Sequence, residues 1–116
     1  MRLRAVAPIL IASIATAQSS NLVMPPPARY DHIYSGELVV RRVPLDDVIW
    51  YCGAKGTQHL ACARIKDGWC RITVPIVGSS AHYRGRMVTV TPSLYRALWQ
   101  HERAHCNGWP ATHPRA

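Results

Sequence analysis

One short stretch of the chain carries residue types whose spacing suits metal chemistry. It reads His101-Glu102-Arg103-Ala104-His105, an H-E-x-x-H pattern. On a helix, residues four apart lie on the same face one turn apart, so two imidazoles at this spacing can bind one zinc ion. The glutamate between them can accept a proton from a metal-bound water. The pattern therefore predicts a zinc site at His101 and His105, with Glu102 as general base.

Two histidines leave such a site incomplete, because catalytic zinc has three protein ligands and a water. No acidic residue follows Glu102, which excludes a carboxylate further along the chain as the third ligand. The next histidine is His113, and the chain after Gly108 is long enough to fold back to the metal. We expect His113 to be the third ligand. The alternatives are a water, a second chain, or one of His32, His59 and His82.

The sequence around the motif predicts the helix that it requires. Thr91 can cap the N-terminus, Pro92 suits the first helical position, and Gly108 suits the left-handed residue that ends a helix. Helical periodicity sorts the side chains into three stripes: Leu94, Leu98, His101 and His105; Tyr95, Trp99, Glu102 and Cys106; Arg96, Gln100, Arg103 and Asn107. We expect the first stripe to face the apolar core, the second to lie at its edge and the third to face the solvent.

The remaining patterns predict an α+β fold in which a small antiparallel or mixed sheet packs on this helix. The expected elements are a strand over 37–43, a short helix over 45–52, a hairpin over 60–76, a loop over 78–85 and a short strand over 86–90. The hairpin turn is Asp67-Gly68, a strong two-residue turn signal that fixes the register of the two strands.

Strand alternation in this hairpin indicates which of the four cysteines can lie close to one another. Cys70 should lie on the apolar face, toward the helix with Cys106, whereas Cys62 should lie on the opposite face, within reach of Cys52. An even cysteine count in an exported chain favours two disulfides, and no C-x-x-C pair points to a zinc knuckle. Four cysteines allow three pairings, of which the faces favour Cys52–Cys62 with Cys70–Cys106.

The N-terminal segment has the features of a secretory signal peptide. Two arginines precede an apolar run over 5–15, and Ala15-Thr16-Ala17 is a small-residue cleavage site. The run is shorter than the roughly 20 residues that a membrane-spanning helix needs, although an uncleaved anchor is the alternative. We expect a signal peptide over 1–17, a flexible proline-rich leader over 18–29 and a single domain over 30–116, in a periplasm or the medium.

The basic charge of the chain does not form a nucleic-acid-binding pattern. The formal net charge is +8, and removing Arg2 and Arg4 with the signal peptide leaves +6. The other basic residues are scattered rather than gathered in a stripe, so we expect no nucleic-acid partner. A basic surface of this kind can associate with an anionic cell envelope.

The motif His101-Glu102-x-x-His105-x-x-Gly108 resembles the zincin metallopeptidases, and its glycine is similar to the metzincin pattern H-E-x-x-H-x-x-G-x-x-H. The match covers eight residues. The third histidine of that pattern would fall at Ala111, two residues before His113, and no methionine follows the helix. The stretch over 101–114 also resembles a compact bacterial family of exported zincin-like proteins. The resemblance implies an active-site helix under a small sheet, whose edge strand, here one of the 60–76 hairpin, binds extended substrate.

These observations predict an exported zinc metallopeptidase that acts on a peptide or protein. Zn²⁺ would be bound by His101, His105 and His113, and Glu102 would act on its water. Tyr83 or His82 are candidates for an additional donor to the developing oxyanion. The alternatives are a zincin-like zinc-binding structural or interaction protein of the envelope without turnover, and an envelope adaptor without metal.

Overall fold

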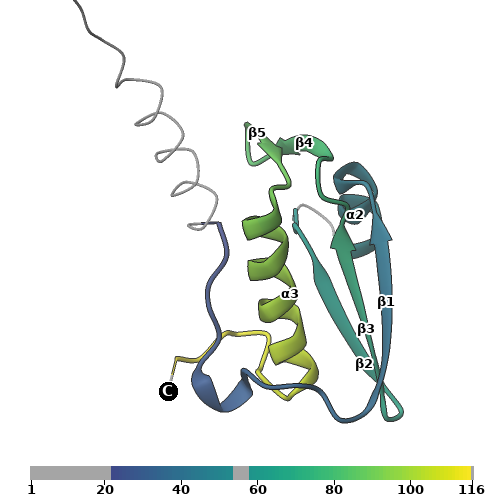
Figure 1. The fold of residues 1–116 in the computed structure, drawn as a ribbon, viewed down its shortest axis with the longest axis vertical. Coiled ribbons are helices and arrows are strands. Elements are labelled where there is room, and N and C mark those ends of the chain that lie inside the picture. The colour runs from purple at the N-terminus through teal and green to yellow at the C-terminus, as the bar shows by residue number, and fades with distance from the viewer. Residues whose placement is uncertain (1–21, 54–57, 116) are drawn as a thin grey trace, which may run out of the picture.

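A three-stranded mixed sheet forms the centre of the fold (Figure 1). The computed structural model describes residues 22–53 and 58–115, so the expected signal peptide lies outside the described residues. The central strand β3 (Trp69–Pro75) pairs in parallel with β1 (Glu37–Val43) and antiparallel with β2 (Cys62–Lys66). β3 is buried along most of its length, as expected for the central strand of a covered sheet.

Two helices complete the core. α2 (Leu45–Cys52) connects β1 to the β2–β3 hairpin, and α3 (Pro92–Cys106) packs against β2 and β3. Both helices and the central strand contribute fully buried side chains, which include Leu45, Val48, Cys70, Ile72, Val74 and Leu94. The fold is therefore α+β with a small mixed sheet packed on the motif helix, as predicted.

The β2–β3 hairpin has the predicted register. Lys66 faces Trp69 across the Asp67-Gly68 turn. Both turn residues have positive φ, 48° and 84°, as a type I′ turn requires. The register confirms that cysteines 62 and 70 lie on opposite faces of the sheet.

The stretch over 78–85, which the sequence predicts to be a loop, instead contains β4 (Ser80–Tyr83), and this prediction was wrong. β4 pairs antiparallel with β5 (Arg86–Thr89) in a second, two-stranded sheet. The connecting turn is Arg84-Gly85, where both residues have positive φ. An arginine seldom adopts that conformation, so the turn carries no conventional sequence signal.

The structure contains two disulfides, Cys52–Cys62 and Cys70–Cys106, which is the pairing that the strand faces favoured. Each disulfide links the C-terminal end of one helix to a neighbouring strand. Two disulfides are compatible with an oxidising, exported location. Among the described residues, no helix is both long and apolar enough to cross a membrane.

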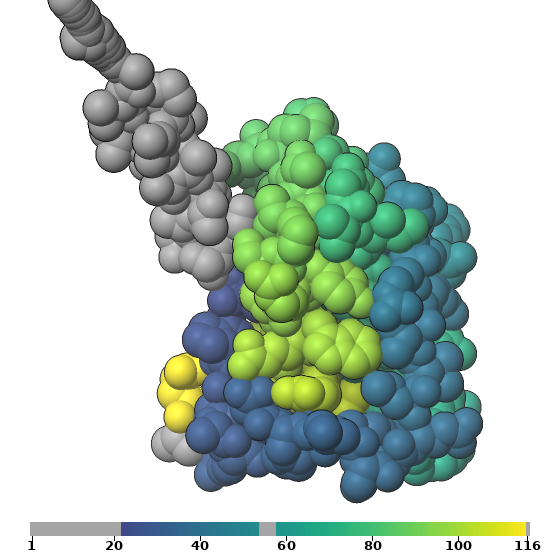
Figure 2. All heavy atoms as spheres, viewed as in Figure 1, coloured from purple at the N-terminus to yellow at the C-terminus, as the bar shows by residue number. Residues whose placement is uncertain are grey.

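The N-terminal segment runs along α3 and passes beneath its C-terminal end before entering β1 (Figure 1). It includes one turn of 3-10 helix, η1 (Ala28–Tyr30), and Figure 2 shows it, in dark blue, filling the surface around the lower end of α3. Composition predicted a flexible leader over 18–29, whereas the described part of that leader, 22–29, contacts the domain. The reason is that its backbone carbonyls accept hydrogen bonds from side chains of the domain.

Candidate metal centre

α3 begins as predicted, and its first turn is capped. The Thr91 hydroxyl accepts a hydrogen bond from the Leu94 amide at 3.1 Å, and Pro92 occupies the first helical position. The cap satisfies one of the donors that a helix N-terminus leaves without an intrahelical partner. The helix then continues without interruption through the H-E-x-x-H motif.

The orientation of α3 differs from the prediction. Glu102 and Cys106, expected at the edge of the core, are buried, whereas the two motif histidines are only half-buried. The polar stripe also differs, because Gln100 and Arg103 are half-buried and hydrogen-bond to Asp31 of the N-terminal segment. Asn107, the third covered member of that stripe, bonds to the same segment. Periodicity alone cannot distinguish a polar face in water from a polar face covered by hydrogen-bonding backbone.

A Schellman motif ends α3 and reverses the chain. Gly108 has φ +103°, its amide donates to the His105 carbonyl, and the Trp109 amide donates to the Ala104 carbonyl, both at 3.0 Å. A second turn follows, in which the His113 amide donates to the Pro110 carbonyl at 2.9 Å. The two turns bring residues 109–115, here called the tail, back to α3.

The tail places His113 beside the two histidines of the motif. The Nε2 atom of His113 lies 3.1 Å from Nε2 of His101 and 3.1 Å from Nε2 of His105. The Nε2 atoms of His101 and His105 are 3.3 Å apart. These three side chains form a group whose donor atoms could hold a metal ion.

Hydrogen bonds on the other ring nitrogens fix the tautomers of the two helix histidines. Nδ1 of His101 lies 2.7 Å from the Met24 carbonyl, and Nδ1 of His105 lies 2.7 Å from the Trp109 carbonyl. A carbonyl only accepts, so each Nδ1 carries the hydrogen and each Nε2 presents a lone pair. Two lone pairs cannot hydrogen-bond to each other, so their convergence indicates a place for a cation.

The spacing of the three nitrogens fits a tetrahedral ion. With Zn–N bonds of about 2.05 Å, separations of 3.1–3.3 Å correspond to N–Zn–N angles of about 98–107°, near the tetrahedral value. A tetrahedral ion held by three imidazoles would have a fourth position for another ligand.

Burial favours the neutral form of two of these imidazoles, those of His101 and His113. The pKa of His101 is lowered to about 4, mainly by burial and less by the nearby His105 and His113, against the hydrogen bond to Met24, which raises it. Burial and His105 also lower the pKa of His113. The backbone of His113 is held at φ 58°, a left-handed conformation that costs about 1–2 kcal/mol outside glycine. Such strain is typical of a residue whose side chain must reach a site.

The Trp109 side chain packs against the rings of all three histidines. Its indole stacks on the His105 ring at 5.0 Å between centroids and meets the His101 and His113 rings edge-on at 4.9 Å. The indole N–H donates to the Pro114 carbonyl at 3.0 Å, which holds the chain next to His113. The side chain is only 2 % exposed.

Glu102 shares a cavity of about 340 Å³ with the three histidines. Its side chain is 6 % exposed, and burial raises its pKa to about 8. The other lining residues come from the segment before β2, from β2 itself and from the tail, and they are His59, Ala61, Cys62, Ala63, Ile65, Trp109 and Ala111. β2 therefore forms one wall of the cavity.

The other sequence candidates are placed differently. His59, an alternative third ligand on sequence grounds, lines the cavity but does not belong to the group of three ligands. His82 is exposed on β4, and neither it nor Tyr83 lines the cavity. His32 lies in the N-terminal segment, where its Nδ1 is 3.1 Å from the Ile33 carbonyl.

Comparison of the chain with protein-family models, with curated proteins and with solved structures finds no match. The function is therefore inferred from the chemistry of the site.

Proposed function

We propose that this protein is an exported zinc-dependent peptidase that hydrolyses peptide bonds at the centre formed by His101, His105 and His113. The observation that carries the proposal is the presence of three convergent imidazole nitrogens and one buried glutamate in a single cavity. A structural metal site needs no fourth ionisable group, and burial of Glu102 disfavours its charged form. A catalytic role gives a reason to keep the glutamate there.

Glu102 is the proton carrier in this mechanism. A bound zinc ion supplies a Lewis acid that polarises a carbonyl and lowers the pKa of a coordinated water. Glu102 lines the same cavity as the ligands, where its carboxylate would accept a proton from an attacking water. The raised pKa of Glu102 lets this carboxyl group hold a proton near neutral pH before passing it on. The same group then delivers the proton to the leaving amine as the peptide bond breaks.

The position of β2 supports a polypeptide substrate. In the part of the chain that the structure describes, β2 pairs with β3 alone, so its other edge has unpaired backbone groups. Residues of β2 also line the cavity. An extended substrate could add a strand to this edge and so bring a peptide carbonyl to the metal centre. The resemblance to zincins implies the same mode of binding.

Glu102→Gln is the substitution that tests the proposal. Residues 18–116, loaded with one equivalent of zinc, are incubated with an unfolded protein and with a peptide library, and the products are read by mass spectrometry. We expect cleavage by the wild type, a loss of at least about 100-fold in Glu102→Gln, and equal zinc contents. Glu37→Gln, an exposed change on β1, is the matched control.

A zinc-binding structural or interaction protein is the second candidate. The observation that favours it is that the third histidine lies on the tail, where bound metal would pin residues 109–115 to α3. If the wild type and Glu102→Gln both bind one zinc and neither cleaves any substrate, this second function replaces the peptidase.

A further inference from the structure

We propose that residues 22–32, here called the N-terminal strap, belong to the metal centre, with the Met24 carbonyl as the group that positions His101. Strap docking and zinc binding would then strengthen each other. This inference rests on the metal-binding part of the proposed function and is independent of catalysis.

The two helix histidines obtain their backbone acceptors from different places. His105 donates to Trp109, four residues further along, in the turn that ends its own helix. His101 donates to Met24, which is 77 residues away in sequence. The local turn therefore orients His105, whereas His101 has its acceptor only when the strap lies on α3. A metal ligand whose second nitrogen is held has a defined tautomer and ring orientation.

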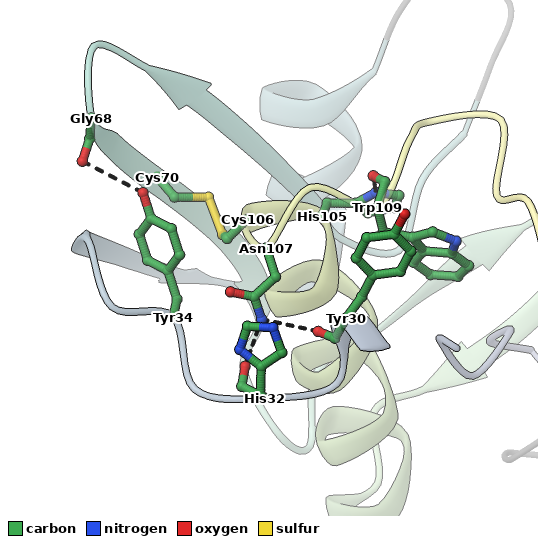
Figure 3. Close-up of a disulfide and its surroundings, with 9 residues drawn as sticks. All are labelled: Tyr30, His32, Tyr34, Gly68, Cys70, His105, Cys106, Asn107 and Trp109. Carbon is green, nitrogen blue, oxygen red and sulfur yellow. Dashed lines mark hydrogen bonds between the residues drawn. A yellow bond between two sulfur atoms is a disulfide. The ribbon is translucent and has the colours of Figure 1, made fainter. Parts of the chain in front are cut away.

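The strap is attached to α3 by the polar stripe of the helix. The Asp31 carboxylate accepts hydrogen bonds from Gln100 at 2.7 Å and from Arg103 at 3.1 Å. The Asn107 side chain donates to two carbonyls of the strap, those of Tyr30 at 2.9 Å and His32 at 2.6 Å (Figure 3). These contacts come from the helix that bears two of the ligands and from its C-cap residue, and they fix the position of the strap along the helix axis.

The strap also contacts the tail that carries the third ligand. Arg115 donates to the Pro25 carbonyl at 2.5 Å, next to the carbonyl that orients His101. The Tyr30 ring lies over the turn at Gly108, where a Cβ would be 4.0 Å from it. The strap thus connects the ligand helix with the returning tail, and it supports both parts of the site.

The coupling has a predicted size. Loss of the group that holds the second nitrogen of a metal ligand lowers metal affinity by about 10- to 100-fold. Because coupling between two binding events is reciprocal, zinc should stabilise the docked strap by the same factor by which docking strengthens zinc binding. The coupling can therefore be measured either as a change in zinc affinity or as a change in the stability of the docked strap.

The test uses residues 18–116 and zinc alone as the probe. In the Asp31→Ala/Asn107→Ala double variant, the zinc Kd, measured by chelator competition, should rise about 10- to 100-fold. Arg96→Ala is the control on the same helix, because Arg96 is exposed. In the wild type, zinc should slow hydrogen exchange at the Tyr30 and Asp31 amides, which donate to backbone carbonyls within the strap.

The proposal is overturned if zinc leaves exchange at these two amides unchanged in the wild type, or if the double variant binds zinc as tightly as the wild type. The exchange measurement needs no substitution, so it decides the matter even if the double variant does not fold. A wild-type chain that binds no zinc overturns the proposed function instead, which is a separate outcome.

Discussion

Replacing His113 by alanine should remove one of the three convergent nitrogens and leave the rest of the centre in place. His101 and His105 keep their acceptors, the carbonyls of Met24 and Trp109, because neither hydrogen bond involves the side chain of residue 113. Two imidazoles fall short of the three protein ligands of catalytic zinc. We expect the zinc Kd to rise by at least about 100-fold, the upper end of the effect of losing an outer-shell group.

A 100-fold rise in the zinc Kd has a measurable effect on the stability of the folded state. At a free zinc concentration of 100 times the wild-type Kd, binding stabilises the folded state by about 2.7 kcal/mol. At the same concentration, a variant with a 100-fold higher Kd gains about 0.4 kcal/mol. For a domain of this size, zinc should therefore raise Tm by roughly 10–20 °C in the wild type and by roughly 2–3 °C in His113→Ala.

Calorimetric melts with and without zinc give these shifts. His113→Gly is the matched control for the backbone, because glycine adopts the left-handed conformation found at φ 58° without strain. Without zinc, His113→Gly should be about 1 kcal/mol more stable than His113→Ala, while both lose the zinc-dependent shift. A His113→Ala variant that retains the full shift would show that His113 is no ligand, and the reasoning from the converging nitrogens would be refuted.

Two further substitutions test other parts of the molecule. Replacing Cys70 and Cys106 by alanine should lower the free energy of unfolding in urea by about 3.8 kcal/mol, because the disulfide joins residues 36 apart in sequence; an unchanged midpoint with an unchanged slope would contradict this. His59→Ala should lower kcat of the proposed peptidase by roughly 100- to 1,000-fold with unchanged zinc affinity, because an imidazole lining the cavity can stabilise charge that develops on the substrate oxygen. His82→Ala is its control, since His82 is exposed outside the cavity, and equal effects of the two changes would remove His59 from the reaction.

The parts of the fold that depend on local signals could be predicted from the sequence. Thr91 and Gly108 mark the ends of the motif helix because capping and left-handed termination each require particular residue types. The turn at 67–68 sets the hairpin register, and the register separates the faces on which Cys62 and Cys70 lie. These faces favoured, among three possible pairings, the one that the structure contains.

The parts that could not be predicted depend on backbone groups or on distant pairing. The acceptor for His101 is the carbonyl of Met24, and every residue type offers the same carbonyl, so no sequence pattern marks it. The parallel pairing of β1 with β3 joins strands that are separated by a helix and a third strand. Arg84 adopts positive φ in the β4–β5 turn against its usual preference, so that hairpin was missed.

The Cys70–Cys106 disulfide divides the proposed metal centre into a side held by a covalent bond and a side that can open. Cys106 directly follows His105 and is covalently joined to the central strand, so the helix that bears two ligands cannot move away without unfolding of the core. The third proposed ligand, His113, lies on the tail, which neither disulfide joins to the rest of the domain. Metal exchange should therefore proceed by opening of residues 109–115, and the rate of zinc loss to a strong chelator should stay nearly constant at denaturant concentrations below the unfolding transition.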